Sequence, residues 1–245
     1  YLMDIELYDQ ANTIITGSAP VSVGNTVKRF EAKEFNSSFA AAYAPDVIVR
    51  DPSTLSNLTV PASAMALGAM SQNDALRDPW FAPAGFNRAV LRNALDVQTR
   101  LNRSNMDDLY EARINPITEF PQFPGEIVIF GQKTLLAAQS ALDRVNVRRL
   151  LIDVRRKVRA AANRLLFEPN KASTLASFAA AVNPILARVQ QRQGLDNYKV
   201  SIDTTTTTQA DIENNTIRGK IFLQPTRSLE FISLDFVVTN AGAEI

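Results

Sequence analysis

The sequence predicts a mixed α+β (α/β) fold in which a β-sheet packs against long helices and the chain ends in a β-hairpin-like region. Residues 144–167 repeat apolar side chains at the 3.6-residue period of an amphipathic helix. Residues 217–223 alternate between apolar and other side chains at a period of two, as a half-buried strand does. Short apolar runs at 47–49 and 125–130 are typical of buried strands. We expect the terminal hairpin-like region to be open to strand addition from another subunit.

Composition excludes most kinds of catalysis. The 245 residues carry a formal net charge of +1 and contain neither histidine nor cysteine. Disulfides, thiolate metal sites, cysteine nucleophiles and Ser-His-Asp triads are therefore excluded. A side chain that titrates near neutral pH is hard to build without these two residue types. We expect no enzyme, no cofactor and no metal, and the near-zero net charge gives no general case for nucleic acid or membrane binding.

Several further elements follow from local signals. Pro61 suits the first turn of a helix over 62–71, and the proline-rich stretch 77–85 is expected to be a loop pinned to the core by Trp80. A helix is predicted to begin at Ser104 and run to about residue 114. A second long helix is predicted over 173–192. Pro184 should kink or split it, and Gly194 should end it in a left-handed cap.

Two tempting ligand sites fail on spacing. The stretch Gly125–Thr134 resembles a phosphate loop, but its apolar strand lies between the glycines instead of before them. Asp203, Asp211 and Glu213 match no carboxylate cage for a hard cation, so turn and capping roles are favoured for them. No apolar run is expected to reach the ~20 residues of a membrane span, and residues 1–4 lack the basic start of a signal peptide.

An arginine ridge lies along one edge of the 144–167 helix. Arg148, Arg155 and Arg159 fall within a narrow arc beside the apolar stripe. Three interpretations stay open: a solvated face, a ridge that faces an acidic protein partner, or a nucleic-acid-binding module that uses the basic 144–164 helix. Basic and aromatic residues do not interleave there, which disfavours nucleic acid.

The run 229–238 predicts a strand that is apolar on both faces. Such a strand must be covered, or it pairs with another chain. It is either a central strand of the chain's own sheet or a strand added between subunits. The residues predicted to form that inter-subunit strand are Phe231, Ile232, Leu234, Phe236 and Val238.

A series of segments, in order, resembles the contractile bacteriophage tail sheath family. Each match is weak alone, but together they are specific. They are 60–64 (VPASA), 77–85 (RDPWFAPAG), 114–120 (INPITEF), 129–135 (IFGQKTL), 144–150 (RVNVRRL), 166–170 (LFEPN), 203–206 (DTTT) and 224–232 (QPTRSLEFI).

The resemblance implies a structural subunit of the virion tail, assembled in the host cytoplasm. Such subunits polymerise around a tail tube, and contraction drives the tube through the host envelope. The implied partners are neighbouring sheath subunits, the tube protein, baseplate proteins and tail terminator proteins, with no nucleic acid and no direct membrane insertion. Residues 1–95 would be the C-terminal part of the main α/β sheath domain and 96–245 the C-terminal sheath domain, unless the two form one compact unit. Residues 1–40 match no family segment and are expected to complete the preceding domain.

Overall fold

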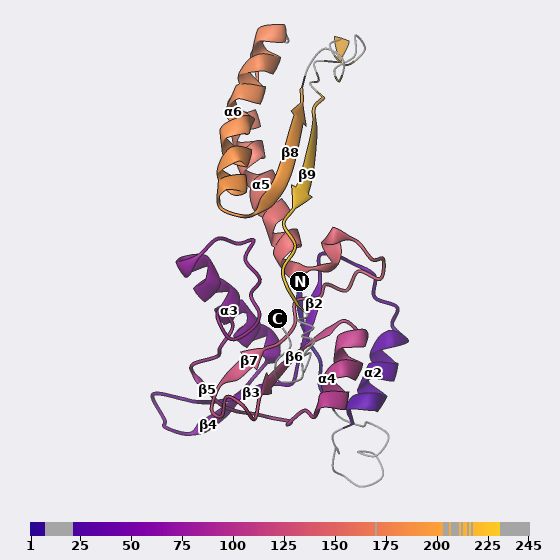
Figure 1. Cartoon of the computed structure of the whole chain (residues 1–245), viewed down its shortest axis with the longest axis vertical. Helices are drawn as coiled ribbons and strands as arrows, with labels where there is room; N and C mark the ends of the chain where they lie inside the picture. The colour runs from indigo at the N-terminus through magenta and orange to yellow at the C-terminus, as the bar shows by residue number, and fades with distance from the viewer. Residues whose placement is uncertain are drawn as a thin grey trace, which may run out of the picture.

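A computed structural model shows two lobes stacked along the long axis of the molecule (Figure 1). It describes residues 1–7, 22–169, 171–202, 206, 211, 213, 214, 216 and 218–230. The sheet lobe contains every described element up to residue 144. The helix–hairpin lobe, consisting of α5, α6, β8 and β9, stands on top of it.

Among its described residues, the sheet lobe contains two sheets, three α-helices and one 3₁₀ helix. Its strands are β1 (Leu2–Asp4), β2 (Ala41–Ala44), β3 (Val47–Arg50), β4 (Asn57–Val60), β5 (Ala94–Val97), β6 (Ile114–Glu119) and β7 (Ile127–Ile129). Its helices are α2 (Val23–Glu31), α3 (Ala62–Leu76), α4 (Arg103–Glu111) and the 3₁₀ helix η1 (Ala141–Asp143). The first sheet has the order β1-β2-β6-β7, parallel except for the antiparallel β6–β7 pair. The second has the antiparallel order β4-β3-β5.

The first sheet is buried on both faces. Along β2, Ala41 and Tyr43 belong to one apolar cluster and Ala42 and Ala44 to the other, as the period of two requires. Helix α3 packs on the first face, where Ala62, Ala66 and Ala69 allow close approach. Helices α2 and α4 cover the opposite face. The predicted strands at 47–49 and 125–130 are confirmed as β3 and β7.

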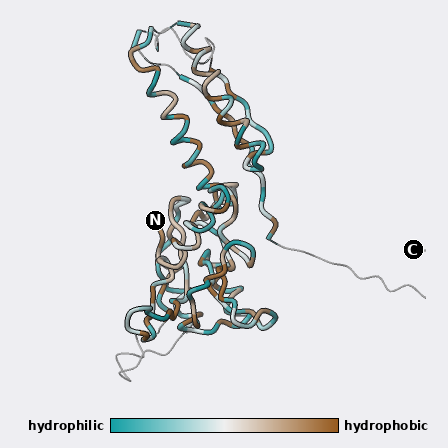
Figure 2. Tube along the Cα trace, turned by 90° about the vertical axis from the view of Figure 1, so that its left-hand side faces the viewer, coloured by the Kyte–Doolittle hydropathy of each residue, from teal (hydrophilic) through white to brown (hydrophobic). Residues whose placement is uncertain are grey.

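The helix–hairpin lobe is thinner. Helix α5 (Val145–Asn163) leads up, α6 (Ala172–Gln191) returns, and β8 (Leu195–Ser201) pairs antiparallel with β9 (Lys220–Pro225). Apolar and polar residues alternate along the turns of this lobe, as the tube in Figure 2 shows. Its small core is completed by Trp80 from the sheet lobe. The other buried members are Leu150, Val154, Val182, Leu186, Val189 and Leu195.

Trp80 therefore anchors its loop as predicted, but to the core of the other lobe. Its indole is 6% exposed, and Nε1 donates to the carbonyl oxygen of Arg192 at 2.9 Å. A second link is the ion pair between Arg192 Nε and Asp78 Oδ2 at 3.0 Å. The proline-rich loop thus fixes the end of α6 to the sheet lobe.

Several boundaries differ from the predictions. The side chain of Asn102, not Ser104, caps α4, and α4 ends at Glu111 because residues from Ile114 onward enter β6. Helix α6 continues through Pro184 without a split. The left-handed residue after α6 is Gln193, at φ 62°, and not Gly194. Gly194 is required for space instead, since a Cβ there would lie 2.7 Å from Val189 Cγ1.

The predicted boundary between residues 95 and 96 stays a prediction. In the structure it falls inside β5, and the first sheet combines strands from both ranges. Residues 2–4 of the weakly patterned start form the edge strand β1 of that sheet.

Helix α6 contradicts the expectation that no segment has membrane-span character. It is long and apolar enough to cross a membrane by length and composition alone. One such helix is weak evidence, since core helices of soluble proteins pass the same test. Here Val182, Leu186 and Val189 are buried against the rest of their own lobe.

Candidate subunit interface

The β8–β9 ribbon is a sheet of only two strands in the described part of the chain. Its inner face packs Tyr198, Val200, Ile221 and Leu223 against the lobe core. Helix α6 lies along β8, and β9 lies on the far side of the ribbon from it (Figure 1). Backbone groups on the outer edge of β9 therefore face away from the helices, in the arrangement that accepts a further strand.

The outer face of the ribbon is exposed. Phe222 leaves 56% of its surface accessible between Lys220 and Gln224, which are also exposed. An exposed aromatic on an open strand is a favourable cross-strand contact for an added strand. The ribbon thus offers both a hydrogen-bonding edge and an apolar anchor.

Residues 226–230 leave β9 and return to the sheet lobe. Thr226 Oγ1 donates to Asp196 Oδ1 at 2.6 Å, and its N–H donates to the carbonyl oxygen of Gly194 at 3.3 Å. Asn146 Nδ2 then donates to Ser228 Oγ at 2.9 Å. These contacts hold the chain in a defined path from the hairpin to the top of the sheet.

Glu230 ends this path in a polar cluster, which we call the Glu230 anchor (Tyr110, Gln132, Arg144 and Glu230). Arg144 Nε donates to Glu230 Oε1 at 2.7 Å and Gln132 Nε2 donates to the same oxygen at 3.0 Å. Tyr110 Oη donates to Oε2 at 2.9 Å. The side chains of Arg144 and Glu230 are only 26% and 19% exposed, so the pair is partly shielded from water. Such charge-assisted bonds are stronger than neutral ones.

The anchor perturbs its neighbours. Burial, together with the hydrogen bond to Glu230, raises the pKa of Tyr110 to about 12. Burial and the charge of Arg144 lower the pKa of Lys133. Lys133 Nζ donates to the carbonyl oxygen of Tyr110 at 2.8 Å and lies 3.4 Å from the centroid of its ring. The amine thus makes a cation–π contact with the ring of Tyr110, whose hydroxyl is held by Glu230.

The rejected phosphate-loop stretch contributes to this anchor. Gln132 donates to the carboxylate of Glu230 and Lys133 to the carbonyl oxygen of Tyr110, so both side chains are used inside the protein. Gly131 provides room, because a Cβ there would lie 2.9 Å from Asn115 Oδ1. Asp211 forms an ion pair with Arg218 at 2.5 Å, while Asp203 lies outside the described residues. Within the described ranges, no three potential metal-ligating side chains cluster.

The arginine ridge divides into two parts. Arg148 turns inward: it donates to Ser38 Oγ and lies 4.0 Å from the centroid of the Phe39 ring. Burial and the charge of Arg155 lower its pKa. Arg155 and Arg159 are exposed, and neither forms an ion pair with any residue that the structure describes. On the same helix, Arg156 and Lys157 both pair with the buried carboxylate of Asp153.

The five residues of the predicted inter-subunit strand lie outside the described residues. They are Phe231, Ile232, Leu234, Phe236 and Val238. The Glu230 anchor directly before them was not predicted. Arg144 and Glu230 each stand in a family-like segment, but 86 residues separate them, and no local pattern signals such a pair.

The part of the chain that contains the ribbon and Glu230 is similar to known proteins. Residues 137–239 match the family model of the phage tail sheath C-terminal domain. The resemblance to contractile tail sheath proteins is confirmed. The tail sheath protein of Vibrio phage KVP40 is 33% identical over 189 residues, which is 77% of this chain and 28% of that protein. The tail sheath protein of Enterobacteria phage T4 gives the same identity and coverage.

Solved sheath structures share the fold. The sheath of the extracellular contractile injection system PVC, in its contracted state, has a TM-score of 0.78 at 27% identity, over 89% of this chain and 61% of that one. The contracted helical sheath of the anti-feeding prophage has a TM-score of 0.72 at 28% identity, over 82% and 56%. The chain spans 28% of the length of the two phage sheath proteins, so it corresponds to only part of such a protein.

Proposed function

We propose that this chain is part of a structural subunit that polymerises into a contractile sheath around a tail tube. Contraction of the sheath would drive the tube through the host envelope. The relatives that support this are themselves tail sheath proteins and contracted sheath assemblies. The subunit is not an enzyme: it belongs to the virion tail, is assembled in the host cytoplasm, and contacts sheath neighbours, the tube, the baseplate and a tail terminator.

The observation that carries the proposal is the two-stranded β8–β9 ribbon beside an anchored C-terminal segment. A two-stranded ribbon is marginal by itself and gains stability from additional strands. The segment after Glu230 has the two-faced apolar pattern of a strand that pairs with another chain. Strand ladders keep their backbone hydrogen bonds while side-chain contacts change. Subunits linked in this way can therefore rotate during contraction without separating.

Truncation after Glu230 tests whether residues 231–238, which we call the C-terminal connector, link one subunit to the next. The shortened protein keeps the anchor and should fold as before, judged by circular dichroism and thermal unfolding. It should fail to form the tubes expected of the untruncated protein, as electron microscopy of both proteins would show. As a matched variant, lysine at the four alternating positions 232, 234, 236 and 238 keeps the length but removes the main apolar face, and should fail likewise. Tubes formed by the truncated protein would refute the connector.

The exposed part of the ridge supports a contact with an acidic partner such as the tube or a neighbour. Replacement of Arg155 and Arg159 by glutamate should weaken assembly, most strongly at low salt. Arg148→Glu should instead destabilise the fold, since its guanidinium packs on Ser38 and Phe39. A gel shift with duplex DNA at two salt concentrations tests the nucleic-acid alternative. Assembly unchanged by the double reversal would leave these arginines a solvated face.

A further inference from the structure

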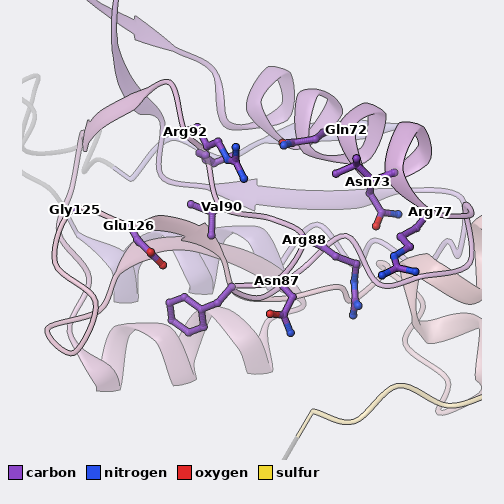
Figure 3. Close-up of a pocket in the computed structure, with 12 residues that line it drawn as sticks. Gln72, Asn73, Arg77, Asn87, Arg88, Val90, Arg92, Gly125 and Glu126 are labelled. Atoms are coloured by element: carbon purple, nitrogen blue, oxygen red, sulfur yellow. The ribbon is translucent and has the colours of Figure 1, made fainter.

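A cleft rich in arginine opens on the α3 side of the sheet lobe. It encloses about 660 Å³ between the end of α3 and the segment 86–92, with Glu126 at the opposite end from Arg77 (Figure 3). Arg77, Arg88 and Arg92 line it, and none of them forms an ion pair with a described residue. Three guanidinium groups and one carboxylate line the cleft, so its net charge is positive and favours a negatively charged partner.

The cleft also has features of a binding site beyond its charge. Asn73 lines it and is 1% exposed, yet its Oδ1 accepts no hydrogen bond from the described residues. A buried acceptor of this kind is costly unless an incoming group donates to it. Phe86 lines the wall and packs at a tilt against the half-exposed ring of Phe123, with centroids 4.5 Å apart. The residues that contribute most of the binding energy at protein interfaces are often arginine and aromatic side chains.

A matching acidic surface lies on the opposite side of the same lobe. Asp107, Asp108 and Glu111 of α4 are exposed, and at 100° per residue they fall within an arc of about 100°. None forms an ion pair with a described residue. Arg103, one turn before Asp107, leaves a net charge of about −2 on this face.

The two surfaces cannot meet within one molecule. Helix α3 packs on one face of the first sheet and α4 on the other, and Figure 1 shows them on opposite sides of the lobe. A contact between different patches of identical subunits is heterologous, and it repeats to form a ring or a helix.

We propose that the acidic face of α4 in one copy docks into the arginine cleft of a second copy. The carboxylates would pair with Arg77, Arg88 and Arg92, and a polar hydrogen from the docking helix would satisfy Asn73 Oδ1. A nucleic acid is disfavoured as the occupant because Glu126 stands in the cleft and would repel phosphates. The contact deepens the proposed sheath function by naming a lateral interface, and it does not use the C-terminal connector.

Cysteine cross-linking tests the contact directly, because the chain has no cysteine of its own. Asn87→Cys places a thiol at the cleft and Ser104→Cys places one on α4, and both positions are exposed. A short bismaleimide should join the two variants into a mixed dimer whose yield falls with added salt. Leu55→Cys, exposed on a different loop, replaces Asn87→Cys in the control mixture. A yield no higher than this control overturns the proposal.

Charge reversal supplies the second arm. R77E/R88E/R92E on the cleft variant should lower the yield about tenfold, as should D107K/D108K/E111K on the α4 variant. Mixing the two reversed variants should restore it, which a folding defect cannot do. R164E/R188E, at two exposed arginines of the helix–hairpin lobe, is the matched control and should leave the yield unchanged. Loss without restoration, together with DNA binding that the cleft reversal abolishes, would assign the cleft to nucleic acid and overturn the proposal.

The chain truncated after Glu230 separates this contact from the proposed function. Cross-linking that persists in the truncated chain supports the α4–cleft contact whether or not the untruncated protein forms tubes. Tubes formed without any α4–cleft cross-link would support the sheath function and overturn the contact.

Discussion

The two lobes differ in how far they can stabilise themselves. The sheet lobe has a four-stranded sheet buried on both faces between two apolar clusters. The helix–hairpin lobe has one small cluster, and it borrows Trp80 from the sheet lobe to complete it. The first is a self-sufficient core, whereas the second is two helices on an open ribbon. The helix–hairpin lobe therefore depends on contacts from outside itself. A neighbouring subunit can supply such contacts at the edge of the β8–β9 ribbon.

The largest expected effect on stability comes from removing the Trp80 side chain, which completes the core of the helix–hairpin lobe. Trp80→Ala should cost about 3–5 kcal/mol in the free energy of unfolding, since it opens a cavity at the contact between the lobes. The loss should appear first as faster amide exchange in α6 and β8, with the sheet lobe still protected. Trp80→Phe keeps most of the packing and loses the bond to Arg192, so it should cost only about 1 kcal/mol. Equal exchange in both lobes of the alanine variant would show that they unfold as one unit.

A smaller effect is expected from filling the space beside Trp80. Gly194→Ala places a Cβ 2.7 Å from Val189 Cγ1 and 3.0 Å from the indole ring, and should cost about 1–3 kcal/mol. Gly68→Ala is the matched control in the sheet lobe, since its Cβ would meet nothing within 4 Å. It lies inside α3 and should stabilise the fold by about 0.5–1 kcal/mol. Chemical denaturation measures both, and a neutral Gly194→Ala would contradict the tight packing inferred there.

The Glu230 anchor is a further connection between the lobes. Glu230→Gln removes the charge that Arg144 and Tyr110 contact and should cost about 1–2 kcal/mol. Amide exchange at residues 226–230 should rise more than in the rest of the chain. The control is Arg100→Gln, which breaks the exposed pair with Asp96 and should cost well under 1 kcal/mol. Unchanged exchange at 226–230 would mean that Thr226 and Ser228 suffice to hold the segment.

The smallest effect is a dependence on alkaline pH. The pKa of Tyr110 is raised in the folded state to about 12 from an ordinary value of 10.0, because burial and Glu230 disfavour the phenolate. The folded state therefore holds this proton more tightly, so the contribution is complete below pH 10.0 and is lost as pH rises toward 12. Tyr110→Phe removes this group, so wild type should lose more stability than the variant across that window. Parallel curves for the two proteins would contradict the assignment.

Local signals predicted the elements whose side chains decide their own conformation. The apolar face of α5 is read from its period, and Val147, Leu150 and Val154 are buried as the period requires. The buried strand β7 and the proline-led start of α3 follow from equally local rules. The cap of α6 was assigned to the wrong residue. Gln193 adopts the left-handed conformation there, and the adjacent glycine meets a steric demand set by Trp80 and Val189.

The sequence by itself determined the class of fold, its two long helices, the buried strands β3 and β7, the absence of histidine and cysteine chemistry and the resemblance to tail sheath proteins. These depend on composition and on short-range periodicity, which a chain carries whatever its neighbours in space. Only the tertiary structure decided that Trp80 serves the upper lobe, that Arg148 turns inward, and that Glu230 meets Arg144 across 86 residues. Packing and ion pairing act between groups that folding brings together, and their separation along the chain leaves no local pattern that predicts them.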